Sequence, residues 1–306
     1  MHRARVRFAV SLAAVAAMSL TACGSLSAIG GPTPGNRPDP KRAILVSVPA
    51  DAVYLIDPDT GGMAIVAQGL TDFQSGYGTW SPSHAHIAYG SAGVVIANAT
   101  DSTDRSLVNG QQIGMPTWSN NGRQIAYANG SDIFVTSVAK ARPSRLPLPD
   151  TLAPFSLDWG PKSTIAFQGL QLSCTSGDCL STDRNDVYVI QSNGSGLRRL
   201  TKYGTASNPK WSPDGKSILF VRGVRHKRRV LSELWTIHAG GGGAAPLLTW
   251  PDIVAADWSS DGSRLAVVRS TGGAVSTLSV WVGNANGSHM HEVVGGIQGS
   301  DASVDW

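Results

Sequence analysis

One stretch decides the fold of this 306-residue chain: Asn208-Pro209-Lys210-Trp211-Ser212-Pro213-Asp214-Gly215-Lys216-Ser217-Ile218-Leu219-Phe220. A tryptophan is followed by an Asp-Gly pair, which tolerates the positive φ of a tight hairpin, and then by an apolar run typical of a β-strand. Tryptophans recur in a comparable setting at intervals of 38 to 52 residues: Trp80, Trp118, Trp159, Trp258 and Trp306. This spacing suits four-stranded propeller blades and is too long for a leucine-rich or other short solenoid repeat.

The internal order of each repeat is also constant. An apolar run starts six or seven residues after each tryptophan, at Ile87, Ile125, Ile165, Ile218 and Leu265. A second run follows around Tyr54, Val95, Phe134, Tyr188, Trp235 and Trp281. Short β-rich runs separated by turns indicate antiparallel strands joined by hairpins, so the sequence predicts an all-β fold.

The two ends of the repeat region complement each other. Trp306 ends a first strand that has no partners, whereas the runs Ile44 to Val48, Val53 to Asp57 and Met63 to Ala67 lack a first strand. Pairing them would close the ring and remove exposed sheet edges. We therefore expect residues 43–306 to form a six-bladed β-propeller of four-stranded antiparallel blades, with the C-terminal strand joining the N-terminal strands.

These residues support a family resemblance. The repeat of TolB-type β-propellers is closely similar to Leu200-Thr201 followed by residues 208–220. Parts of the pattern return as Leu70-Thr71, Leu248-Thr249, Ser81-Pro82 and Ser119, while Gly160-Pro161 replaces the usual serine. The resemblance covers the chain after residue 42. It implies a TolB-like (WD-repeat-like) propeller lipoprotein that acts in protein contacts of the bacterial cell envelope.

The amino terminus predicts export. Three arginines precede the 15-residue apolar stretch Phe8 to Ala22, which is too short to span a bilayer comfortably and suits a signal peptide over residues 1–22. The tetrad Leu20-Thr21-Ala22-Cys23 resembles the bacterial lipobox, which implies cleavage before Cys23 and lipid attachment to that cysteine. The alternative is an ordinary secretory signal with a spare cysteine. Residues 23–42 are rich in Gly, Ser and Pro, and we expect a flexible linker that holds the propeller at the extracytoplasmic face of the cell membrane.

Charge and cysteine usage fit this address. The formal net charge of +4 includes the three signal arginines, so the mature chain is close to neutral and nucleic acid is not an expected partner. Beyond Cys23 only Cys174 and Cys179 remain. In an exported chain this pair predicts a disulfide, worth about 2 kcal/mol for so small a loop. Zinc is the competing interpretation, although two cysteines alone make a poor site.

Two loops depart from the repeat on the predicted face that carries the second-to-third-strand connections. They are Gly169 to Asn185, which contains the cysteines, and Arg222 to Leu231, which is basic. Adjacent blades would place them side by side, and clustered arginines suit acidic surfaces. The predicted partner-binding residues are Arg222, Arg225, His226, Lys227, Arg228 and Arg229, with the inter-blade loop aromatics Phe73, Tyr77, Phe155, Tyr203 and Trp250. The alternatives are a solvated hairpin tip for the charges and packing between blades for the aromatics.

Catalytic patterns are weak. There is no Gly-x-Ser-x-Gly elbow, and the chain has only two glutamates, Glu233 and Glu292. The pairs His84 with His86 and His289 with His291 could each begin a metal site, but two ligands do not complete one. We predict no catalytic residue, metal or cofactor, and a monomer that binds an envelope protein or glycan. The alternative is a metal-dependent polysaccharide lyase or hydrolase with a site in the axial funnel.

Overall fold

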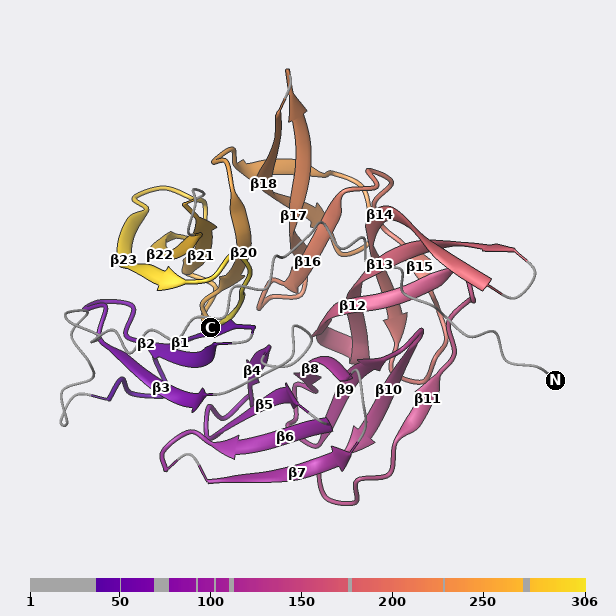
Figure 1. Cartoon of the computed structure of the whole chain (residues 1–306), viewed down its shortest axis with the longest axis horizontal. Coiled ribbons are helices and arrows are strands. Elements are labelled where there is room, and N and C mark those ends of the chain that lie inside the picture. Colours follow the sequence, from indigo (N-terminus) through magenta and orange to yellow (C-terminus); the bar gives the residue numbers. More distant parts are fainter. Residues whose placement is uncertain are drawn as a thin grey trace, which may run out of the picture.

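The predicted six-bladed β-propeller is confirmed. The computed structural model describes residues 37–49, 51–68, 77–91, 93–101, 103–109, 113–175, 178–227, 229–271 and 276–306. Its strands form six four-stranded sheets arranged around a central axis (Figure 1). Among the described residues, no helix is long and apolar enough to cross a membrane. The signal peptide, Cys23 and most of the predicted linker lie outside the described residues.

Every blade is antiparallel, and we number the blades from the one that contains both ends of the described chain. Blade 1 consists of β24 (Ser303–Asp305), β1 (Ile44–Val48), β2 (Ala52–Ile56) and β3 (Met63–Gln68). Blade 2 consists of β4 (Gly78–Trp80), β5 (His86–Ser91), β6 (Gly93–Asn98) and β7 (Asp104–Asn109). Blade 3 consists of β8 (Ile113–Trp118), β9 (Gln124–Asn129), β10 (Asp132–Ser137) and β11 (Ser144–Leu146). Blade 4 consists of β12 (Leu152–Trp159), β13 (Thr164–Thr175), β14 (Asp178–Gln191) and β15 (Arg198–Arg199). Blade 5 consists of β16 (Ala206–Trp211), β17 (Ser217–His226), β18 (Arg229–His238) and β19 (Ala245–Leu248). Blade 6 consists of β20 (Ile253–Trp258), β21 (Arg264–Ser270), β22 (Thr277–Asn284) and β23 (His291–Gln298). A 3-10 turn, η1 (Pro161–Ser163), precedes β13.

Ring closure occurs as the sequence predicts. β24 pairs with β1, and Val46 lies opposite Val304 in that ladder. Trp306 joins the apolar core shared by blades 6 and 1. The chain ends therefore share one sheet, and blade 1 has no missing strand.

The repeated turn explains why each tryptophan is followed by a hairpin. In blade 5, Ser212 Oγ accepts a hydrogen bond from the Ser217 N–H (3.0 Å), and Asp214 Oδ1 accepts one from the Lys216 N–H (3.0 Å). Gly215 adopts φ +68°, which favours glycine. Blade 6 repeats the turn, where hydrogen bonds from Ser259 and Ser263 lower the pKa of Asp261 to about 2. The serine and aspartate therefore satisfy backbone donors that the turn leaves free.

The residue before each repeat tryptophan ties neighbouring blades together near the axis. The Trp211 N–H donates to Asp158 Oδ2 of blade 4 (2.7 Å), and the Trp80 N–H donates to Asp305 Oδ2 of blade 1 (2.6 Å). The equivalent residue of blade 5 is Lys210, whose ammonium can donate hydrogen bonds but cannot accept one from a backbone N–H. The Trp258 N–H bonds instead to Asp257 of its own blade (2.8 Å).

Lys210 lies at the centre of an axial ion-pair cluster. Its Nζ is 2.6 Å from Asp305, 3.1 Å from Asp257 and 3.9 Å from Asp158, and these side chains are 11 to 18% exposed. Burial raises the pKa of Asp257 well above its usual range, and the neighbouring Asp305 and Asp158 raise it further while Lys210 opposes the shift. The three carboxylates raise the pKa of Lys210 against the effect of its burial. One ammonium thus joins blades 4, 5, 6 and 1.

The end of the predicted linker packs against the face opposite the long hairpins. Pro38 is buried, and the Pro40 carbonyl lies 2.9 Å from His84 Nδ1. The indole N–H of Trp306 donates to the Arg42 carbonyl (3.0 Å), and that of Trp80 donates to the Ala43 carbonyl (3.2 Å). Residues 37–42 are therefore part of the folded unit, although the sequence pattern placed them in the flexible linker.

Candidate partner-binding surface

Two long hairpins mark the candidate surface, as the sequence predicts. β13 and β14 have 12 and 14 residues, and β17 and β18 have 10 each. Their bases are joined by the connection between blades 4 and 5, because Asn185 bridges to Thr205 and the Gly223 N–H donates to the Thr205 carbonyl (3.0 Å). Their tips point in different directions, away from the ring (Figure 1). The two insertions are thus neighbours at their bases and separate at their tips.

The connection between the hairpins is held by a buried carboxylate. Asp186 is fully buried and accepts hydrogen bonds from Thr201 Oγ1 (2.7 Å), the Tyr203 N–H (2.8 Å) and the Gly204 N–H. Arg199 forms an ion pair with it at 2.6 Å. A buried carboxylate with this many donors fixes the loop in one conformation. The backbone around Tyr203 is therefore preorganised.

Arg222 lies between two aromatic rings on this loop. Its guanidinium carbon is 3.6 Å from the centre of the Tyr203 ring and 4.3 Å from that of Trp235. Tyr203 also stacks on Phe220. Such cation–π contacts orient an arginine without neutralising it. Arg222 Nε is buried and has no hydrogen-bond partner among the described residues, whereas the residue as a whole is partly exposed.

Glu233 anchors the hairpin beside this stack. It lies opposite Arg222 in the β17–β18 ladder and is only 4% exposed. One carboxylate oxygen is 2.9 Å from His226 Nε2, and the other accepts the indole N–H of Trp235 (3.1 Å). His226 lies opposite Arg229 next to the hairpin turn, with the basic residues as predicted, and Glu233 holds its ring against the hairpin.

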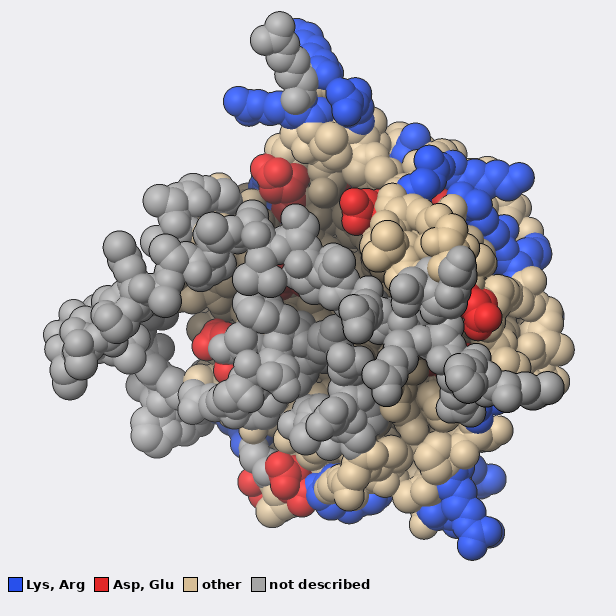
Figure 2. All heavy atoms as spheres, turned by 45° about the vertical axis from the view of Figure 1, so that its right-hand side comes forward, with Lys and Arg blue, Asp and Glu red and all other residues tan. Residues whose placement is uncertain are grey.

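The hairpin tips combine charge with apolar surface. Arg225, Lys227 and Arg229 are exposed, and Figure 2 shows Lys and Arg side chains projecting from the upper edge of the molecule, where Figure 1 places this hairpin. Arg228 lies outside the described residues. The exposed large hydrophobic side chains of the described chain are Val230, at 60%, and Leu180, at 56%, so each long hairpin carries one.

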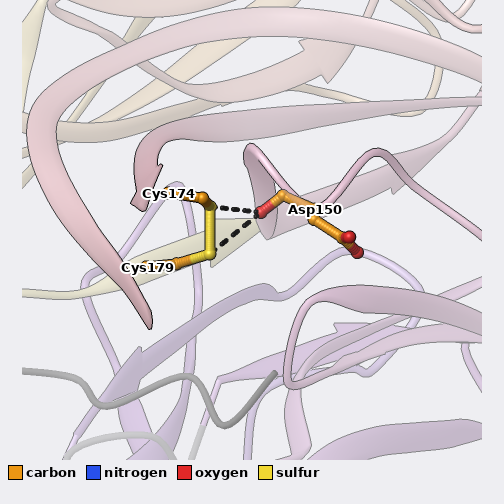
Figure 3. Close-up of a disulfide and its surroundings, with 3 residues drawn as sticks. All are labelled: Asp150, Cys174 and Cys179. Carbon is orange, nitrogen blue, oxygen red and sulfur yellow. Dashed lines mark hydrogen bonds between the residues drawn. A yellow bond between two sulfur atoms is a disulfide. The ribbon is translucent and has the colours of Figure 1, made fainter. Parts of the chain in front are cut away.

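The cysteines form the predicted disulfide near the tip of the β13–β14 hairpin. Cys174 and Cys179 are directly opposite in the ladder and bonded through sulfur. Figure 3 shows the Asp150 carbonyl oxygen beside both sulfurs, at 3.3 Å and 3.8 Å. Oxidised sulfurs carry no hydrogen, so these are packing contacts. The disulfide therefore secures the hairpin over the connection that leads from blade 3 into blade 4.

The predicted loop aromatics do not form one surface. Tyr77 is buried and donates to Asp301 (2.6 Å), and burial raises its pKa. Phe155 lies within β12 instead of in a loop, because a bulge between Phe155 and Leu157 lengthens that strand. It packs on the core below the disulfide. Trp250 packs edge-on against Trp281, and Phe73 lies outside the described residues. Of this set, Tyr203 contacts the basic hairpin.

The histidine pairs do not assemble a site. His84 stacks on Trp80, and His289 contacts Asn284 and Ser288. Within the described ranges, no group of three or more His, Cys, Asp and Glu side chains is arranged to hold a metal ion.

Sequence reasoning missed three residues of this surface: Arg184, Asp186 and Glu233. The guanidinium of Arg184 lies against the backbone of Gly204, next to Tyr203. Charged residues in strands of a β-repeat are usually exposed, so the pattern alone gave no reason to single them out. A signal was available for Glu233, because glutamate is so rare in this chain.

The sequence matches no protein-family model and no curated protein. Solved structures with a similar fold include TolB from Acinetobacter baumannii, with a TM-score of 0.66 and 16% identity over 86% of this chain and 67% of that one. A nidogen/laminin complex has a TM-score of 0.63 and 10% identity over 86% and 97%. An oligogalacturonate lyase in complex with manganese has a TM-score of 0.55 and 11% identity over 82% and 74%. The chain therefore has the TolB-like propeller fold, and at these identities the likeness establishes the fold alone.

Proposed function

We propose that this protein is a lipid-anchored, extracytoplasmic binding protein that recognises an acidic envelope partner through the β17–β18 hairpin and the Tyr203 loop. The observation that carries the proposal is the hairpin itself, which extends beyond the ring and presents three described cationic side chains with an exposed valine. Surfaces that combine arginine with exposed apolar groups are typical of protein interfaces.

The geometry supports binding more than chemistry. The loop at the hairpin base is fixed by Asp186, so little ordering would be needed on association. Among the three fold relatives, TolB and the nidogen/laminin complex agree with a binding protein. The nearly neutral propeller does not discriminate between acidic and basic partners, but the positive charge of the hairpin favours an acidic one.

Site-specific cross-linking in intact cells tests this function. A photoreactive phenylalanine analogue replaces Val230, and the cross-linked product is identified. We expect one dominant envelope product, which is lost when Arg225, Lys227 and Arg229 are all changed to alanine. The matched control changes Arg142, Lys162 and Lys216, which are also exposed and remove the same charge. Equal products from both triple variants would contradict the proposal.

The anchor requires a separate test. Labelling with a radioactive fatty acid should mark the wild-type protein and not the Cys23→Ala variant, which should be released from the membrane fraction. Label that survives the substitution would remove the anchor from the proposal and leave the binding surface unaffected.

The alternative is a propeller enzyme that acts on envelope polysaccharide, and the fold likeness to a lyase is what favours it. A funnel site would have to use the axial residues, yet Lys210 already forms ion pairs with three aspartates there. Turnover of anionic envelope polysaccharide by purified protein, abolished by Lys210→Met in a variant that remains folded, would support the enzyme.

A further inference from the structure

We infer that Arg184 and Arg222 together form a carboxylate site for an acidic side chain of the partner protein. The inference rests on the binding function proposed above and specifies its chemistry. The two arginines come from different blades, and both lie against consecutive residues of one loop, Tyr203 and Gly204.

Arg222 is oriented before any ligand arrives. The rings of Tyr203 and Trp235 hold its guanidinium, and its Nε is buried, so a ligand can approach only through the terminal Nη groups. Two parallel N–H donors on a planar group match the two oxygens of a carboxylate. Fixing the side chain beforehand reduces the entropy lost on binding.

Arg184 reaches the same loop because residue 204 is a glycine. A side chain at Gly204 would meet the Arg184 guanidinium at 3.2 Å, and the backbone there has φ +73°. Arg184 is exposed and has no ion pair within the described residues, so it adds a second cationic group to the loop that Arg222 contacts. The carboxylates beside it on β14 already have partners: Asp183 accepts a hydrogen bond from Ser181 Oγ, and Asp186 is bonded to Arg199 and the loop.

Blade 6 shows that an open arginine is not a general property of the repeat. Arg269 occupies the position of Arg222 and lies near Trp250 and Trp281, but its Nε and Nη2 both donate to the Pro251 carbonyl at 3.3 Å. No described acceptor does this for Arg222. Glu233, which faces Arg222 across the ladder, uses its oxygens for His226 and Trp235. The Nη groups of Arg222 therefore have no acceptor among the described residues and are available to a ligand carboxylate.

The surroundings favour a protein carboxylate over an acidic sugar. Leu180 and Val230 are exposed on the two hairpins whose bases meet at this loop. A partner that reaches from the arginines along either hairpin would meet an aliphatic as well as a charged side chain, which suits the mixed surface of a protein.

Arginine side-chain NMR tests the site on the full chain. The Nε–Hε signals of Arg184, Arg222 and Arg269 are assigned by their loss in single Arg→Lys variants. Titration with a hexaglutamate peptide should shift the signals of Arg184 and Arg222 along one saturation curve and leave Arg269 unmoved. Hexaglutamine at the same salt concentration should shift none of them. Arg184→Lys should weaken the Arg222 response about tenfold or more, because a charge-assisted contact is lost.

Several results would overturn the inference. They are an unmoved Arg222 signal, equal shifts with hexaglutamine, an Arg222 response that is independent of Arg184, or tighter binding of a trigalacturonate, which would assign the site to sugar. The Arg269→Lys variant, which should bind as the wild type does, controls for folding. If the Val230 cross-link survives Arg222→Lys but not loss of the tip charges, the carboxylate site is wrong and the binding function stands.

Discussion

Blades 5 and 6 are built on the same plan and differ where the chain meets solvent. Both have an arginine eleven residues after the repeat tryptophan, and both place it among aromatic side chains. In blade 6 the arginine donates to a loop carbonyl, that of Pro251, and Ser279 accepts the indole N–H of Trp281 (2.9 Å). In blade 5 no residue that the structure describes gives the arginine such an acceptor, and Glu233 takes the place of Ser279. The repeat thus supplies an arginine–aromatic stack whose arginine is hydrogen-bonded in blade 6 and is left for a ligand in blade 5.

The difference teaches how a repeat fold can acquire a site without a new scaffold. Blade 5 lengthens β17 and β18 to ten residues, and the added part carries the exposed charges. The layers beneath the extension, Phe220 and Leu219, remain fully buried as in the other blades. Stability therefore stays in the shared layers, and binding is assigned to the added ones.

The largest expected effect is at the axis, where blade 5 has Lys210 and blade 6 has Asp257. Lys210→Met leaves three buried carboxylates without their cation, and we expect a loss of about 3–5 kcal/mol in the free energy of unfolding. Asp257→Asn keeps an acceptor for Trp258 and should cost only about 1 kcal/mol. Denaturant unfolding at pH 8 measures both. Equal losses would show that the two positions are equivalent.

The Lys210 loss should depend on pH. Burial already raises the pKa of Asp257 and Asp158, and removing the ammonium raises both further. The folded state then binds protons more tightly than the unfolded chain, so its stability falls as pH rises above the unfolded value near 3.8. Unfolding of Lys210→Met should therefore show a smaller deficit at pH 5 than at pH 8. A deficit that grew on acidification would contradict the cluster.

The paired arginines offer a sharper comparison with a smaller effect. Arg269→Met removes both the ring contacts and the bonds to Pro251, so it should cost about 1–2 kcal/mol of stability. Arg222→Met removes ring contacts alone and should cost about 0.5–1 kcal/mol. Partner cross-linking through residue 230 should show the reverse order, with loss for Arg222→Met and retention for Arg269→Met. If stability and binding fell together in both variants, Arg222 and Arg269 would not have the different roles assigned to them.

The sequence predicted the architecture more completely than it predicted the candidate binding surface. Tryptophan spacing predicted the ring, because the repeat shows that the strands at the two chain ends lack partners. Two cysteines five residues apart predicted the disulfide, because their pairing depends on local order. The axial cluster depends on Lys210 meeting Asp305 from 95 residues away, which no local pattern encodes. Likewise, Arg184 and Arg222 contact one loop only because the connection that carries Tyr203 and Gly204 lies between their strands. The bulge that places Phe155 inside β12 depends on backbone geometry at Ser156, where φ is +46°.

The smallest expected effect concerns the carboxylate that distinguishes blade 5 from blade 6. Glu233→Gln keeps an acceptor for Trp235 but removes the charge facing His226, whose side chain is half exposed, so the stability loss should stay below about 1 kcal/mol. The hairpin should nevertheless open more often, and trypsin should cut faster after Arg225, Lys227 or Arg229. Ser279→Ala, the matched change in blade 6, should leave that rate unchanged because no basic hairpin depends on it. An unaltered cleavage rate in Glu233→Gln would mean that the aromatic stack alone holds the hairpin, and that the glutamate serves only the Trp235 indole.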